Sequence, residues 1–182
     1  MTQADSSTRD RVIALIAEIL EIEPSRVQGS SRMREDLGMD SLASLELLST
    51  LSEQLKKGPV VLAFFPAAFS GTCTTELCTF RDSSPELNKV NATVLGVSVD
   101  TFFALKAFAD SQSFKFPLLS DFNKDVIRKY GVVNPDMIGL KDISKRATFV
   151  IDRSGVVRYS EVLDDARNEP NYAKVKQALA SL

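Results

Sequence analysis

Short apolar runs alternate with helical patterns along residues 56–182, and this alternation is the feature that most constrains the fold. The apolar runs are continuous, without polar residues at every second position, as is typical of strands in a sheet covered on both faces. They occupy residues 59–65, 93–99, 116–120, 147–151 and 156–162. We therefore expect an α/β layer fold for this part of the chain.

Helical patterns fill the intervals between the apolar runs. We expect helices at residues 73–82, 101–112, 123–130 and 171–182. Gly131 is placed to end the third of them, and Arg153, Ser154 and Gly155 form a tight turn that joins the last two strands as a hairpin. The predicted order, βαβαβαββα, is a thioredoxin-like arrangement.

The first 55 residues differ from the rest in periodicity and in charge. Apolar residues recur at helical spacing before Pro24 and again after Asp40, which can cap the second helix. This segment has five Lys and Arg against ten Asp and Glu, whereas residues 56–182 have seventeen against fourteen. The sequence therefore predicts a small helical unit at residues 1–55 and an α/β unit at residues 56–182.

The chain contains no histidine and two cysteines, which excludes several kinds of site. Serine–histidine triads are impossible, and two cysteines supply neither a disulfide framework nor a four-thiolate metal site, so no metal site is predicted. No apolar run is long enough to span a membrane, and the polar N-terminus is unlike a targeting signal. We expect a soluble, cytoplasmic protein that binds neither nucleic acid nor membrane.

Cys73 stands where a strand, a loop and a helix follow one another in residues 59–82. The pattern places it at the start of the helix, where the helix dipole and unpaired backbone N–H groups favour a thiolate. A lone cysteine among apolar residues is more commonly a buried, unreactive side chain. Its position at a helix N-terminus favours a nucleophile instead.

The segment PAAFSGTC resembles the Pro-x-x-x-Thr/Ser-x-x-Cys motif of the peroxiredoxins, with Pro66, Ser70 and Cys73 at its fixed positions. Glu76 and Arg146 stand where that family has a glutamate and its active-site arginine. The resemblance covers residues 57–182. It implies a thiol-dependent peroxidase that reduces hydrogen peroxide or organic hydroperoxides through a sulfenic acid on Cys73 and needs no cofactor.

The matched residues have distinct expected roles. Arg146, a permanent cation, would stabilise the Cys73 thiolate and donate hydrogen bonds to the peroxide oxygens. The Ser70 hydroxyl would accept a hydrogen bond from the peroxide, and Pro66, which lacks an N–H, would shield the thiolate from water. Glu76 also has two simpler explanations, as an acid in the first helical turn or as a partner of Arg81.

Cys78 offers a resolving thiol, and the Cys-x-x-x-x-Cys spacing resembles that of bacterioferritin-comigratory, or Q-type, peroxiredoxins; AhpE-like enzymes are the other related type. Five helical residues rise by about 7.5 Å and point the two side chains to different faces, so the helix must unwind before a disulfide forms. The alternative is a buried Cys78 and an external resolving thiol. The resemblance implies thioredoxin or another thiol as the reductant. A homodimer is one of the oligomeric states that the sequence allows.

The segment EDLGMDSLASLELL resembles the phosphopantetheine attachment motif of acyl carrier proteins, with Ser41 as the modified residue. This resemblance covers residues 8–54. It implies a 4′-phosphopantetheine group, attached by a phosphopantetheinyl transferase at a helix N-terminus that suits a phosphodiester.

Both resemblances look truncated at the junction near Leu55, Lys56 and Lys57. Two further helices of a carrier bundle are missing, and so are the strands that precede the first core strand of a peroxiredoxin. A fusion with an internal deletion, alternative splicing or engineering would each explain this. With half of its bundle absent, the helix at residues 42–55 is expected to dock on the sheet.

Three functions therefore remain open from the sequence. The favoured one is a peroxide-reducing enzyme, because its matched residues are complete. The alternatives are an acyl or phosphopantetheine carrier fused to a peroxiredoxin-like body, and an inactive truncated form with an interaction role.

Overall fold

The computed structural model describes residues 42–182, with side chains from Ser49 onward. Ser41, Asp40 and the helix predicted before Pro24 lie outside the described residues. The elements follow one another as α2 (Leu42–Lys57), β1 (Val60–Phe64), α3 (Gly71–Asp82), α4 (Ser84–Lys89), β2 (Thr93–Ser98), α5 (Phe102–Gln112), β3 (Leu118–Ser120), α6 (Asp125–Lys129), β4 (Val133–Met137), β5 (Leu140–Ser144), β6 (Arg146–Ile151), β7 (Val157–Leu163) and α7 (Tyr172–Ala180).

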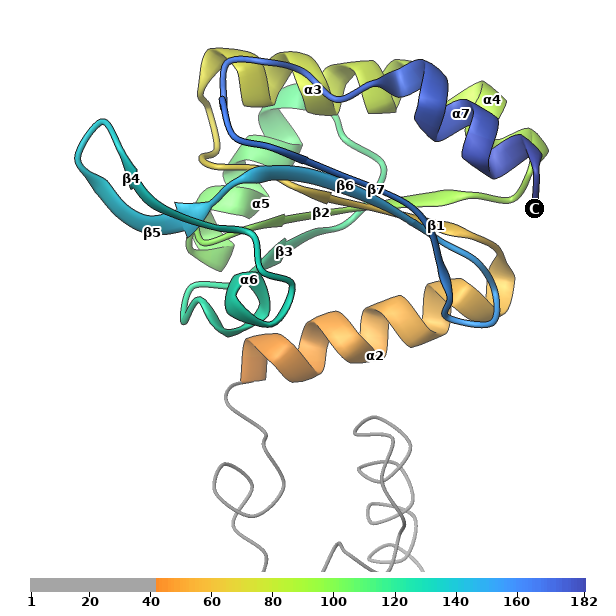
Figure 1. Cartoon of the computed structure of the whole chain (residues 1–182), viewed down its shortest axis with the longest axis horizontal. Helices are drawn as coiled ribbons and strands as arrows, with labels where there is room; N and C mark the ends of the chain where they lie inside the picture. The colour runs from red at the N-terminus through yellow and green to blue at the C-terminus, as the bar shows by residue number, and fades with distance from the viewer. Residues whose placement is uncertain (1–41) are drawn as a thin grey trace, which may run out of the picture.

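The main sheet has five strands in the order β3-β2-β1-β6-β7 (Figure 1). β1 runs parallel to β2 and antiparallel to β6, so the sheet is mixed. β6 and β7 form the predicted hairpin, whose turn contains Gly155 at φ +80°. The thioredoxin-like α/β fold predicted from the sequence is thus confirmed.

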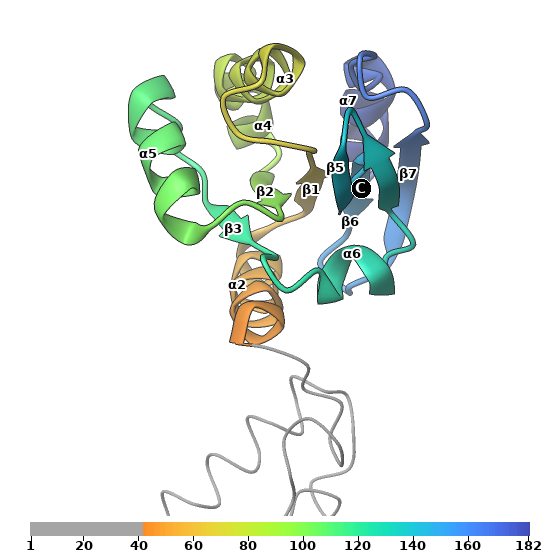
Figure 2. The same cartoon turned by 90° about the vertical axis from the view of Figure 1, so that its left-hand side faces the viewer.

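Both faces of the sheet are covered, as the continuous apolar strands predict. Val60, Leu62 and Phe64 of β1 face one core cluster, whereas Val61 and Ala63 face another. Figure 2 shows α2 and α6 on the first side of the sheet, and α3, α4 and α7 on the second. α5 packs beside β3 and joins α3 in a third cluster that contains Cys73.

α2 docks on the sheet, as expected for the helix at residues 42–55. Leu51 is buried in the core cluster that contains Val60, Leu62 and Phe64 of β1, and Leu55 packs against the same cluster. The helix ends at Lys57, and the N–H of Gly58, which follows it, donates to the Gln54 carbonyl at 3.1 Å. A Cβ on Gly58 would lie 1.9 Å from the Asn91 carbonyl oxygen, so the turn from α2 into β1 requires glycine.

Three features differ from the sequence expectations. α3 begins at Gly71, two residues before the predicted start at Cys73. α4 was not predicted because its six residues are mostly polar and only Leu87 among them is buried. The separate β4–β5 hairpin was not predicted because half of its strand residues are exposed and its strands lack the apolar pattern of a core strand.

Candidate active site

Cys73 is the third residue of α3 and is completely buried. The first backbone bond of this helix runs from the Thr74 N–H to the Ser70 carbonyl at 2.9 Å. Within residues 42–182, the N–H groups of Gly71, Thr72 and Cys73 have no hydrogen-bond acceptor. The sulfur therefore lies at the positive end of α3, among free donors, although the helix starts one half-turn earlier than predicted.

The loop that precedes α3 is held in place by Asp100, which the sequence analysis did not single out. Asp100 Oδ2 accepts from the Ala68 N–H at 2.7 Å and from the Ser98 hydroxyl at 2.7 Å. Ser70 Oγ donates to the Ala67 carbonyl at 2.9 Å, so its oxygen lone pairs are left to accept. Pro66 is buried at the start of the same loop.

Arg146 reaches this loop from the first residue of β6. Its neighbour Ala147 pairs with Phe64 at the carboxyl end of β1, which is where the loop towards Cys73 begins. Arg146 Nη2 lies 3.4 Å from Cys73 Sγ and donates to the Ala166 carbonyl at 2.8 Å. Arg146 is 1% exposed, so water does not screen its charge.

Glu76 is the partner of Arg146. Its Oε2 accepts from Arg146 Nη1 in a fully buried ion pair. Burial raises the pKa of Glu76 to about 7, against the opposite effect of the Arg146 charge. Burial would also lower the pKa of Arg146, but the charges of Glu76 and Cys73 outweigh it, and the net shift is upward. Arg146 therefore stays cationic beside the sulfur.

Neither simpler explanation of Glu76 matches the structure, because α3 begins at Gly71 and has no acidic residue in its first turn. Arg81, the other candidate partner, binds Asp82 and the Gln112 carbonyl instead. Glu76 Oε1 and Arg146 Nε are buried without a partner among the described residues. A bound molecule with a donor and an acceptor would satisfy such atoms.

Cys78 lies on the same helix as Cys73, and both thiols are free. Cys78 is half-buried, and its Sγ donates to Gln112 Oε1 at 3.6 Å. α3 is continuous from Gly71 to Asp82, so the two cysteines are separated by intact helix in this reduced form. A disulfide between them requires the helix to unwind, as predicted from their spacing.

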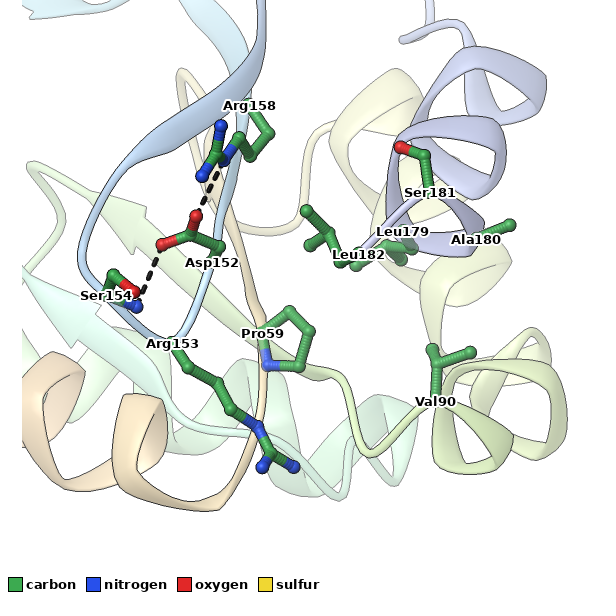
Figure 3. A pocket seen from close by; sticks show the side chains of 10 residues that line it. All are labelled: Pro59, Val90, Asp152, Arg153, Ser154, Arg158, Leu179, Ala180, Ser181 and Leu182. Atoms are coloured by element: carbon green, nitrogen blue, oxygen red, sulfur yellow. Dashed lines mark hydrogen bonds and ion pairs between the residues drawn. The ribbon is translucent and has the colours of Figure 1, made fainter.

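An open hollow of about 810 Å³ lies at the other end of β1 (Figure 3). It is lined by Pro59, just before β1, by the β6–β7 turn and by the C-terminal residues. Cys73 follows the opposite, carboxyl end of β1, so this hollow is not part of the thiol site.

The described residues contain neither a group of three or more potential metal ligands nor a helix long and apolar enough to cross a membrane.

Comparison with known proteins identifies the family. The AhpC/TSA family model matches residues 46–160, which is more than half of the chain. The chain belongs to the AhpC/TSA family. A second model, the phosphopantetheine attachment site, matches residues 10–64 and includes Ser41. The two matches share residues 46–64, which contain the second half of α2 and all of β1.

Relatives and solved structures agree with this assignment. Alkyl hydroperoxide reductase E of Mycobacterium tuberculosis is 42% identical over 105 residues, which cover 57% of this chain and 66% of the relative. The chloroplastic 2-Cys peroxiredoxin BAS1 of Hordeum vulgare is 33% identical over 135 residues, which cover 70% and 62%. The chain thus spans less than two thirds of the length of these two relatives.

The crystal structure of peroxidoxin BcpB from Mycobacterium tuberculosis superposes with a TM-score of 0.65 at 36% identity. The superposition covers 72% of this chain and 84% of that chain. The arrangement of strands and helices around Cys73 is therefore the fold of this family.

Proposed function

We propose that this protein is a thiol peroxidase in which Cys73 attacks hydrogen peroxide or an organic hydroperoxide. The observation that carries the proposal is the 3.4 Å approach of Arg146 Nη2 to Cys73 Sγ at the first turn of α3. A thiolate is the nucleophilic form of cysteine, and a buried cation together with free N–H donors stabilises it. Family membership supports the same chemistry.

The first step breaks the peroxide O–O bond. The Cys73 thiolate attacks one oxygen, an S–O bond forms, and the leaving hydroxide or alkoxide takes a proton to become water or an alcohol. Negative charge moves from the sulfur to the leaving oxygen during the attack. Arg146 and the free N–H groups at the start of α3 stabilise this charge both on the thiolate and on the leaving oxygen. Ser70 Oγ has lone pairs that can accept the peroxide O–H, and Pro66, buried at the start of the same loop, has no N–H to donate to the thiolate.

Cys78 is the proposed resolving thiol, with an external thiol as the alternative. Its attack on the Cys73 sulfenic acid forms a disulfide and releases water. Thioredoxin or another thiol would then reduce this disulfide. The step requires the turn of α3 between the two cysteines to open, because the intact helix holds them on different faces.

Peroxide treatment of the purified protein is expected to produce an intramolecular Cys73–Cys78 disulfide, with consumption of peroxide when a thiol reductant is added. Peptide mapping without reductant locates the bond, and intact mass gives a loss of two hydrogens. Cys78→Ser is the matched control and should stop at the Cys73 sulfenic acid. A disulfide between two chains, or sulfinic acid alone, would contradict resolution by Cys78.

We also propose that Ser41 accepts 4′-phosphopantetheine, which is supported by the attachment-site match across residues 10–64. When bound, the group supplies a thiol on a flexible arm. Ser41 directly precedes α2, and Leu51 and Leu55 of α2 pack against the sheet. That part of the helix is therefore engaged with the peroxiredoxin-like body instead of a carrier bundle.

Incubation with a phosphopantetheinyl transferase and coenzyme A is expected to add one phosphopantetheine mass to the protein. Ser41→Ala should abolish the addition, and Ser49→Ala, on the exposed side of α2, should not. Intact-mass spectrometry is the measurement. An unmodified wild-type protein under conditions that modify a known carrier would show that the N-terminal segment is not a carrier substrate.

A further inference from the structure

We propose that Arg81 is a positioning residue that activates Cys78 for its attack on oxidised Cys73. The inference rests on the proposed function, because it concerns the resolving step of that peroxidase cycle. Arg81 lies three residues after Cys78 on α3, so the two side chains occupy neighbouring places on one face of the helix. That face is turned towards the C-terminal end of α5, where Gln112 is the last residue.

Gln112 holds both side chains. Its side-chain Oε1 accepts from Cys78 Sγ at 3.6 Å, and its backbone carbonyl accepts from Arg81 Nη1 at 2.7 Å. Arg81 is further fixed by Asp82, whose Oδ1 accepts from Nε at 2.8 Å and whose Oδ2 accepts from Nη2 at 3.2 Å. The guanidinium is thus anchored at Gln112, the residue that also binds Cys78, with about one third of the Arg81 side chain exposed.

The anchored cation interacts with the thiol electrostatically. The hydrogen bond with Asp82 is the largest cause that raises the pKa of Arg81, and the interaction with Cys78 raises it further. A cation held in place at a partly buried site stabilises a neighbouring thiolate more than a freely hydrated one does. Arg81 is thus placed to act on Cys78 through its charge, whereas Arg146 donates directly to Cys73 Sγ at 3.4 Å.

α3 and α5 contribute the polar groups that bind Cys78 or Arg81. α3 contributes Arg81 and the Asp82 carboxylate that is bound to it, and α5 contributes the uncharged Gln112. Cys78 also packs against the apolar cluster that contains Leu77, Phe108 and Phe114. The Asp82 charge reduces the effect of Arg81 on the sulfur but also fixes the position of the guanidinium.

The contact with Gln112 also ties the second half of α3 to α5. The turn between Cys73 and Cys78 can open while Cys78 and Arg81 stay together in the last turns of the helix. The Cys78 thiolate then attacks the sulfur of the Cys73 sulfenic acid. An S–S bond forms, the S–O bond breaks, and the leaving hydroxide takes a proton to give water, so no further oxidant is required.

The test is a single-turnover experiment with Arg81→Gln, in which sulfenic acid formation and disulfide formation are followed separately as a function of pH. We expect sulfenic acid formation at the wild-type rate. We expect disulfide formation to be about tenfold slower at neutral pH. We also expect the rate of disulfide formation to rise at a higher pH in the variant than in the wild type. Arg81→Lys should restore part of the rate, and Arg128→Gln, on α6, should behave as wild type.

A second measurement does not depend on peroxide chemistry. In the Cys73→Ser background, alkylation of Cys78 by iodoacetamide is expected to need higher pH once Arg81 is replaced with glutamine. An unchanged pH dependence in both experiments would overturn the role of Arg81, even if the disulfide formed more slowly, because a purely structural anchor would not move the pH profile. Absence of any sulfenic acid on Cys73 in the wild-type protein would instead reject the proposed peroxidase function, and the alkylation experiment would still test Arg81.

Discussion

Replacing Cys73 with serine is expected to lower the rate constant for peroxide consumption by at least about 1000-fold, because a serine hydroxyl is not ionised at neutral pH and is a weak nucleophile. The substitution removes no carbon atoms, so the cluster of Phe65, Leu77, Leu105 and Phe108 around the side chain should stay intact. Peroxide consumption under pseudo-first-order conditions, with thermal unfolding as a check of folding, is the measurement.

Cys78→Ser is the control for this prediction, because it removes the other thiol and leaves the proposed nucleophile. It should react with the first equivalent of peroxide as fast as the wild type and should fail only in disulfide formation. Turnover at the wild-type rate by Cys73→Ser would show that the nucleophile is assigned wrongly. Inactivity of the wild-type protein with every reductant would favour the third function that the sequence left open, an inactive form with an interaction role.

Much of this site could be predicted from the sequence because its parts are local or chemically distinctive. Residues 59–82 contain the strand, the loop and the helix that place Cys73, and all three can be seen in a continuous stretch of sequence. Arg146 is distant in sequence and was found by resemblance to a family, since an arginine at the start of a strand is usually a solvated charge. The antiparallel pairing of β6 with β1 brings it to Cys73.

Other parts of the site could not be predicted because they depend on tertiary contacts of common residues. Asp100 follows a buried strand, as polar site residues often do, but nothing in the sequence says that it holds the Ala68 N–H 32 residues away. The Ala166 carbonyl that binds Arg146 carries no side-chain signal at all. Glu76 had two simpler explanations besides its position in the family motif, and its ion pair with Arg146 of β6 favours the family position.

The two family matches overlap at the junction between the helical segment and the sheet. Residues 46–64 satisfy both family patterns, and the fold uses them as one unit in which α2 leads into β1 through Gly58. Leu51 and Leu55 supply apolar surface to the sheet face, so this helix has a structural role whichever family it resembles. Sequence periodicity predicts such an apolar face but does not identify the surface that it covers.

Replacing Arg146 with methionine is expected to slow the reaction of Cys73 with peroxide by about 100-fold, because a preorganised donor and its charge are removed from the reacting atoms. The same change leaves the Glu76 carboxyl buried without its partner, and we expect a loss of about 3 kcal/mol in the free energy of unfolding. Urea unfolding at neutral pH and stopped-flow peroxide kinetics measure the two effects.

The two effects must be separated, since a destabilised protein can be slow for reasons unrelated to catalysis. The double variant Arg146→Met/Glu76→Met replaces the buried ion pair with two apolar side chains of similar length, an exchange that often costs little stability. We expect it to recover most of the free energy of unfolding and to stay about 100-fold slow with peroxide, because the charge near Cys73 Sγ is still absent. Recovery of the rate together with the stability would mean that Arg146 and Glu76 only hold α3 against β6. Recovery of stability alone would assign to Arg146 a direct part in the attack on the peroxide.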